Sequence, residues 1–375
     1  EQARSVAPWT LPSTRSVLLG DQPEAWGLIP TLQERFGNEG WATAFLAGNV
    51  YLSSNFEIAD NWGTHRCINW PLAEVQVDRA LSVLDRYDDR STFMMLHFMD
   101  MHLPYTEPFS YRNLFAGEAP KSLPDYQFLL NEVRRAAKNL GPEGKQYVQD
   151  RYDNNLRYID DQLARVLGSL SDDDVLVLFS DHGEEFWDHG GFEHGHTLFD
   201  ELLRVPLVIR GPGIQAGRFD APVSLVDVAP SVARAVGLSS AGMTGWALQD
   251  LADGSKKDDF VGRPIAFGRP LYGHRRWGTL SGNKKYTTMA GRETLFDLQS
   301  DAAEKKALSV GSEEYDRWRS ILGEALGRDS GLALRFVPNK STSGGDLVVE
   351  VHVPGGVAHG FAAEDPTKKS HAEVT

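Results

Sequence analysis

Residues 175–213 read VLVLFSDHGEEFWDHGGFEHGHTLFDELLRVPLVIRGPG, and this stretch decides the fold. It begins with five apolar residues, as expected of a strand buried on both faces, and the run 205–209 predicts another strand. Asp181 and His182 follow the first strand directly. Ligand sites of open α/β sheets lie beyond the carboxyl ends of the strands, so we expect a functional site at this turn.

The turn is followed by an unusual concentration of histidines. The chain has eleven histidines, and four of them fall within fifteen residues of one another: His182, His189, His194 and His196. An isolated Asp-His-Gly favours a capped turn with a structural histidine, but structural histidines would be scattered. Carboxylate oxygens and imidazole nitrogens are ligands of divalent cations. We therefore predict a cation site at Asp181 and His182.

Strand and helix patterns alternate over the first 240 residues. Strands are also predicted at 43–47 and 92–98, and amphipathic helices at 71–87 and 152–170. This alternation predicts an α/β fold with a largely parallel sheet. Later come predicted short strands at 263–267, 277–280, 284–288 and 294–298, and a helix at 313–326. We therefore predict a main domain at 1–240, a small antiparallel sheet-and-helix subdomain at 241–328, and an extra β segment or disordered tail at 329–375.

The composition excludes some functions. The net charge of −14 argues against nucleic acid as a partner, because phosphate binding depends on Lys and Arg. No apolar run approaches the roughly 20 residues of a membrane span. The single cysteine, Cys67, excludes an internal disulfide. Because the sequence opens without Met, a signal peptide upstream stays open, and the location is left between cytoplasm and periplasm or outside.

The central stretch resembles the signature of the sulfatase family of the alkaline phosphatase superfamily. The resemblance runs through SDHGE, DHG, HGHTLF, RVPL and GPG, and continues in the segments 153–163, 223–237 and 285–304. It implies an alkaline-phosphatase-like sandwich, with a mostly parallel central sheet flanked by helices. It also implies that Asp181 and His182 bind one divalent cation, for which we favour Ca²⁺ over Mg²⁺, Mn²⁺ or Zn²⁺.

The same resemblance implies a histidine that contacts the anion. In the family a Lys or His shortly before the Thr-Leu-Tyr/Phe segment contacts the sulfuryl or phosphoryl oxygens. That role falls on His194 or His196, and the choice stays open because Gly195 occupies the ungapped position.

Thr10 begins a second candidate segment, a short predicted helix with Pro12 in its first turn and Gly20 at its end. A hydroxyl there lies at the positive end of the helix dipole, which suits either a nucleophile or an N-cap residue. The resemblance to Cys/Ser-x-Pro-x-Arg puts Thr10 at the nucleophile position and implies that Thr10 is a ligand of the cation together with Asp181 and His182. Thr14 occupies the position of the motif's Arg. Arg15, one residue along, is therefore the candidate for binding the anionic group of the substrate.

Threonine at this position affects the predicted chemistry. Sulfatases oxidise the Cys or Ser to formylglycine, and threonine cannot be converted. Related phosphoethanolamine and phosphoglycerol transferases use a threonine nucleophile. The resemblance therefore leaves both sulfate and phosphate chemistry open.

His102 lies in the loop after the predicted strand 92–98, in the sequence MDMHLPY at 99–105. A lone histidine there could simply pack on Tyr105. The loop resembles the family's HxPHxPY segment, which implies that His102 donates a proton to the leaving group. Imidazole suits this role because its ordinary pKa lies near neutrality. Asp100 is expected to orient His102 or to line the pocket.

The predicted cation site is incomplete in the sequence. The family's first strand ends in aspartates that complete the site, and only nine residues precede Thr10. We therefore expect that strand upstream of Glu1. The leading hypothesis is a metal-dependent hydrolase of a small anionic ester: a sulfated or phosphorylated sugar, a lipid headgroup or an aryl ester. The alternatives are a phosphoethanolamine- or phosphoglycerol-type phosphotransferase and a non-catalytic relative that binds anions.

Overall fold

The computed structural model describes residues 2–121, 123, 139–289 and 291–326, and the backbone of three later strands. Those strands are β15 (Ala333–Pro338), β16 (Leu347–Val353) and β17 (Gly356–Ala362), which form an antiparallel sheet. The chain divides into two compact units, 1–260 with 268–275 and 261–267 with 276–375. No helix within the described residues is long and apolar enough to cross a membrane.

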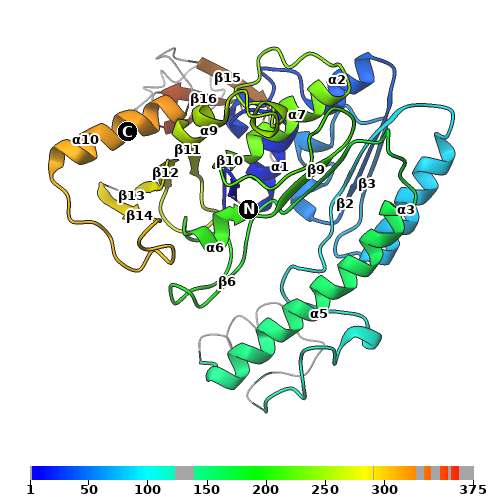
Figure 1. The fold of residues 1–375 in the computed structure, drawn as a ribbon, viewed down its shortest axis with the longest axis horizontal. Helices are drawn as coiled ribbons and strands as arrows, with labels where there is room; N and C mark the ends of the chain where they lie inside the picture. Colours follow the sequence, from blue (N-terminus) through cyan, green and yellow to red (C-terminus); the bar gives the residue numbers. More distant parts are fainter. Residues whose placement is uncertain are drawn as a thin grey trace. The chain divides into compact units, whose positions relative to one another are not determined.

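A parallel sheet lies in the first unit. Its middle strand is β2 (Ala42–Ala47), wholly buried, with β3 (Thr64–Cys67) on one side and β4 (Thr92–Leu96) on the other. Helix α3 (Ala73–Arg86) packs on β2 and β4, and α5 (Pro142–Leu167) packs on α3 (Figure 1). The buried apolar run of β2 explains its central position, because both of its faces are covered.

Five further strands of the first unit pair outside the parallel sheet, in both parallel and antiparallel directions. β5 (Leu176–Phe179) pairs antiparallel with β9 (Leu207–Arg210). β1 (Ala3–Arg4) pairs parallel with β10 (Val223–Ser224) and antiparallel with β8 (Arg204–Val205). The α/β class and the parallel sheet are confirmed, but β5, β9 and β8 pair antiparallel in separate small sheets instead of extending the parallel one. The single strand predicted at 205–209 is divided at Pro206, which has no N–H to donate.

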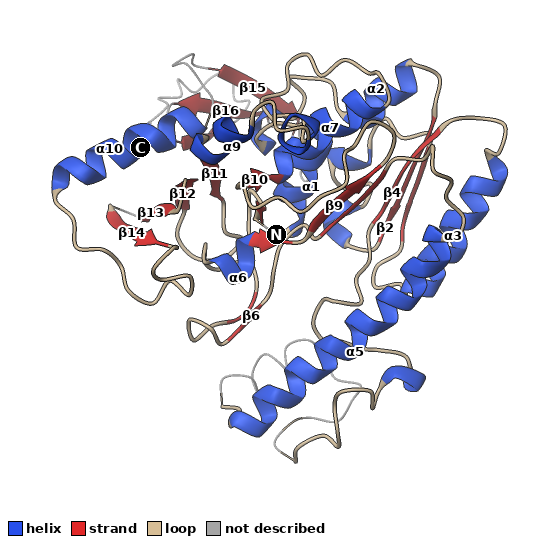
Figure 2. Cartoon of the chain, in the orientation of Figure 1, coloured by secondary structure: helices blue, strands red, loops and turns tan. Residues whose placement is uncertain are grey.

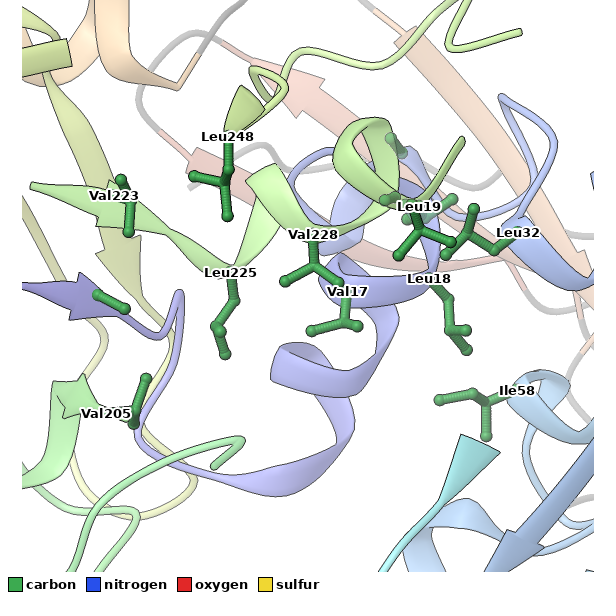
Figure 3. Packing of buried hydrophobic residues seen from close by; sticks show 14 of the residues in the cluster. Val17, Leu18, Leu19, Leu32, Ile58, Val205, Val223, Leu225, Val228 and Leu248 are labelled. Carbon is green, nitrogen blue, oxygen red and sulfur yellow. The ribbon is translucent and has the colours of Figure 1, made fainter. Parts of the chain in front are cut away.

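Helix α1 (Thr10–Leu19) lies in the core of the first unit. It packs against the turn η5 (Leu225–Asp227) and helix α7 (Val228–Ala235). Figure 3 shows Val17 of α1 beside Val228. The helix ends at Gly20, whose φ of 69° is left-handed, and a Cβ there would lie 3.0 Å from Cβ of Ala229. Glycine therefore both stops α1 and permits its close approach to α7.

Shorter elements complete the first unit. The helices are α2 (Leu32–Asn38), α6 (Asp200–Leu203), α8 (Gln249–Ala252) and α9 (Lys257–Gly262), the last reaching into the second unit. Strands β6 (Glu185–Phe186) and β7 (Phe192–Glu193) form a hairpin directly after the Asp181 turn. The hairpin folds the histidine-rich segment back on itself.

The second unit contains the predicted antiparallel sheet and helix. Its sheet has the order β11 (Ile265–Gly268), β12 (Arg276–Ser281), β13 (Lys284–Met289) and β14 (Arg292–Asp297), as Figure 2 illustrates. Helix α10 (Ser312–Ala325) packs on β12. Its core includes Ala266, Tyr286, Leu295, Trp318 and Leu322. The elements predicted between 263 and 326 are thus confirmed to within a few residues.

Candidate active site

Thr10 is the first residue of α1 and is 4% exposed. The preceding residue, Trp9, makes no side-chain cap, so Thr10 is inside the helix rather than at its N-cap. The Nδ2 atom of Asn49 donates to Oγ1 of Thr10 over 3.4 Å. Asn49 follows β2, so the loop after the central strand approaches the start of α1.

Asp181 lies beside Thr10. Burial raises the pKa of Asp181, but the neighbouring imidazoles of His182, His97 and His194 and a hydrogen bond from Thr10 together hold this pKa below its ordinary value. Its Oδ2 atom is buried and has no hydrogen-bond partner among the described residues. A buried carboxylate oxygen without a donor is suited to a cation, because an unpaired polar atom is otherwise costly.

His182 is oriented toward the same carboxylate. Its Nδ1 is bonded to the carbonyl oxygen of Gly183 at 2.8 Å, and its Nε2 lies 3.7 Å from Oδ2 of Asp181. Because Nδ1 is bonded to Gly183, Nε2 is the ring nitrogen that remains available to a cation. No cluster of three or more metal-binding side chains occurs in the part of the chain that the structure describes. Asp181 and His182 fit part of a cation site, and their role as ligands stays a prediction.

Gly183 allows the turn to approach α6 closely. A Cβ at this position would lie 2.0 Å from the carbonyl oxygen of Glu201, and the Gly183 N–H donates to Leu202 over 2.8 Å. Only glycine fits this contact without a backbone shift. The turn that holds Asp181 and His182 is therefore fixed by backbone packing.

Three imidazoles lie in a row. The ring of His194 is 4.2 Å from that of His182 and 4.8 Å from that of His102, measured between centroids. The Nδ1 atom of His102 is bonded to the carbonyl oxygen of Leu103 at 2.7 Å. Burial, followed by the charge of His194, lowers the pKa of His102 to about 4. The pKa of His102 therefore lies below the ordinary imidazole value, because the ring is desolvated and faces another histidine.

Two adjacent carboxylates separate the roles of the histidines. Oε1 of Glu184 is 2.8 Å from Nδ1 of His194, whereas Oε2 of Glu185 is 2.7 Å from Nε2 of His196. Glu185 also accepts from the backbone N–H of Gly191 over 2.6 Å, inside the hairpin. His194 thus joins the row of imidazoles, and His196 braces the hairpin. This geometry favours His194 for the anion contact, which stays a prediction.

Arg15 has different surroundings. Its guanidinium lies 3.6 Å from Glu57 and 5.1 Å from the ring centroid of Trp26. Five residues along an α-helix rotate a side chain by roughly 140°, so Arg15 and Thr10 lie on different faces of α1. The anion-binding role of Arg15 stays a prediction.

Residues that the sequence argument did not single out also belong to this region. Asn49 contacts Thr10, and Glu184 contacts His194. His97 directly follows β4; its buried Nδ1 has no hydrogen-bond partner among the described residues, and its imidazole helps to lower the pKa of Asp181. A polar residue that ends a buried strand on the ligand edge of the sheet was the available signal for His97.

Comparison with known proteins gives the family. The Sulfatase family model matches residues 43–238, more than half of the chain. A choline-sulfatase of Rhizobium meliloti (strain 1021) is 32% identical over 166 residues, which are 41% of this chain and 31% of that protein. The chain thus spans about a third of the length of such curated relatives, 31% in both of the first two.

Solved structures show the same fold. A 2-O GAG sulfatase superposes with a TM-score of 0.66 at 17% identity, covering 86% of this chain and 82% of the other. A phosphonate monoester hydrolase from Silicibacter pomeroyi gives 0.67 at 15% identity, covering 87% and 86%. The family match, the shared fold and the Asp-His turn beyond β5 agree, and this chain belongs to the sulfatase family of the alkaline phosphatase superfamily.

Proposed function

We propose that the protein is a metal-dependent hydrolase of sulfate or phosphate esters in which Thr10 is the nucleophile. The observation that carries this proposal is the position of the Thr10 hydroxyl. It lies buried in the first turn of α1, within reach of Asn49 and beside Asp181. The helix N-terminus offers free N–H groups and positive potential to an anionic ester.

The side chains around Thr10 have complementary roles in an in-line displacement. The Thr10 hydroxyl gives its proton to water, and its oxygen forms a bond to phosphorus or sulfur while the bond to the leaving oxygen breaks. Asn49 and His194 stabilise negative charge on the remaining ester oxygens. A divalent cation at Asp181 and His182 would supply positive charge that favours the ionised hydroxyl. Water then cleaves the ester on Thr10 and regenerates the enzyme.

His102 is the proposed proton donor to the leaving oxygen. In the free protein its lowered pKa, near 4, makes the ring neutral at pH 7. A bound anionic ester beside the ring favours the charged form and raises this pKa toward the working range. We therefore expect the proton on His102 to be taken up together with substrate.

A phosphotransferase is the second candidate, and the identity of residue 10 favours it over a true sulfatase. Threonine cannot be converted to formylglycine, so the intermediate would be a simple ester of Thr10. Transfer instead of hydrolysis requires only that an acceptor alcohol replaces water in the second step. The two candidates share the first step and differ in the acceptor.

Three variants of the protein expressed from its complete gene test the proposal. Aryl sulfate, phosphate monoester and phosphodiester are offered with and without divalent cations. We expect Thr10→Ala and Asp181→Ala to lose at least about a hundredfold in kcat, as removal of a nucleophile or charge-stabilising group does. Ser16→Ala is the matched control, because Ser16 is a buried hydroxyl of the same helix.

Accurate mass of a trapped Thr10 adduct distinguishes a phosphoryl from a sulfuryl group, and added alcohols reveal transfer. Failure of the wild-type protein on every ester would overturn the hydrolase proposal. Activity that survives both Thr10→Ala and Asp181→Ala would show that the site is wrong.

A further inference from the structure

Trp70 is an exposed aromatic residue beside the row of imidazoles. Its ring centroid lies 4.9 Å from that of His102, with the planes at 77°, and the residue is 40% exposed. An exposed large aromatic side chain gains less from burial than the same residue in the core. Its position next to the proposed proton donor therefore calls for an explanation other than packing alone.

The backbone of Trp70 is unfavourable for a tryptophan. Its φ is 62°, in the left-handed region that bulky residues rarely occupy. Pro71 follows, and a residue before proline favours extended backbone, which adds to the cost. The Trp70 N–H donates to the carbonyl oxygen of Gly48 over 3.0 Å. The loop after β2 thus holds Trp70 in this conformation.

Backbone strain of this kind recurs next to the same histidines. Tyr105, three residues after His102, has φ 54°, and Glu193, directly before His194, has φ 72°. Non-glycine residues with positive φ cluster at ligand-binding positions, where surrounding structure holds them. The observation at Trp70 belongs to this pattern and points to ligand binding.

The proposed reaction fixes what lies near Trp70. His102 protonates the leaving oxygen, so the group attached to that oxygen must lie close to His102 and to its neighbour. We propose that Trp70 forms a leaving-group subsite that receives a ring, either an aryl group or the apolar face of a pyranose. A flat indole face stacks favourably on such rings. This inference rests on the proposed ester hydrolysis and adds the class of leaving group.

The test compares two esters that differ in the leaving group alone. One is a phenyl ester, and the other is the ester of a fluorinated alkyl alcohol of matched pKa, with the phosphate or sulfate chosen as the wild-type protein prefers. We expect the wild-type protein to favour the phenyl ester. Trp70→Ala should reduce that preference in kcat/KM by about tenfold, and Trp70→Phe should keep most of it.

Two further variants control for folding and for general loss of aromatic surface. Trp70→Gly removes the ring but adopts positive φ without strain, so it should fold and should also lose the preference. Phe109→Ala removes an aromatic residue of the same unit that is 83% exposed, and it should leave the preference unchanged.

The outcomes separate this inference from the proposed function. A wild-type protein that is active on both esters without preference, or a Trp70→Ala variant that slows both equally, overturns the ring subsite. A choline ester is offered as a third substrate; a loss confined to it in Trp70→Ala would assign the indole to a quaternary ammonium and would overturn the ring class. A wild-type protein inactive on every ester contradicts the hydrolase proposal itself.

Discussion

At the scale of single residues, the neighbouring carboxylates Glu184 and Glu185 divide the histidine segment. Successive side chains of an extended segment point to opposite sides. Glu184 therefore reaches His194 and accepts a hydrogen bond from the hydroxyl of Tyr105 at 3.0 Å, while Glu185 turns to His196. Because Tyr105 belongs to the His102 loop, Glu184 connects that loop to the Asp181 turn.

We predict that Glu184→Ala lowers kcat for ester hydrolysis by roughly 10- to 100-fold, the usual loss when the partner of a functional histidine is removed. His194 would lose the acceptor that holds its Nδ1–H and would rotate away from His102. Tyr105→Phe, which removes only the second donor to Glu184, should lose a few-fold at most. Steady-state kinetics and a melting temperature for each variant check this. An Ala variant with unchanged kcat would show that His194 needs no orientation.

The sequence contains the signal for part of this site only. Thr10, Asp181 and His182 stand in short segments that resemble family motifs, so they could be proposed directly. The choice between His194 and His196 depends on how the β6–β7 hairpin folds, which local sequence does not specify. Asn49 and Trp70 come from loops after other strands, and their relevance appears only once the sheet brings the strand ends together.

At the scale of elements, the loop after β4 is joined to the start of α3. Oδ1 of Asp100 accepts from the backbone N–H of Ala73 over 3.1 Å, where α3 begins. This contact places the carboxylate at a helix N-terminus, which suits a negative charge. The expected role of Asp100 in orienting His102 or lining the pocket stays a prediction. Burial raises the pKa of Asp100 to about 6, and its Oδ2 has no partner among the described residues.

A pH-dependent difference in stability follows from Asp100. Asp100 binds its proton more tightly in the folded state than in the unfolded state. Its contribution to the free energy of unfolding is therefore complete below about pH 4 and is lost as pH rises through 6. Relative to Asp100→Asn, the wild-type protein should therefore lose about 2 kcal/mol of unfolding free energy between pH 4 and 7. His102 has the opposite trend but is present in both proteins. Urea unfolding at several pH values measures the difference, and a constant difference would contradict the prediction.

Element boundaries show where periodicity succeeds and where it fails. β2, β4 and α3 lie within a few residues of their predicted positions because their apolar patterns are dense. α5 begins at Pro142 instead of 152, because its first turns are polar and show a sparse apolar stripe. The antiparallel pairing of β5 with β9 could not be predicted, because an apolar run leaves strand direction open. The burial expected of the run 175–179 on both faces is also wrong at Leu178, which is 41% exposed.

At the scale of the whole molecule, each compact unit has its own apolar core, and the second unit adds a buried ion pair. Nζ of Lys285 lies 2.8 Å from Oε1 of Glu304, and both side chains are 1% exposed. Both residues belong to the segment 285–304 that resembles a family motif. The family resemblance at 285–304 therefore reflects a structural ion pair of the second unit, whereas the resemblance at the Asp181 turn covers residues of the proposed active site.

We predict that Glu304→Ala destabilises the second unit by about 3–5 kcal/mol, because it leaves the Lys285 ammonium buried without its partner. The double variant Lys285→Met with Glu304→Leu removes both charges and should recover most of that loss. Hydrogen exchange provides the readout: in Glu304→Ala, amides of β12–β14 should lose protection while those of β2 and α1 keep theirs. The proposed catalytic residues all lie in the first unit, so ester hydrolysis at low temperature should survive. Equal loss of protection in both units would show instead that the chain unfolds as one cooperative body, and the two cores would then have to be treated as one.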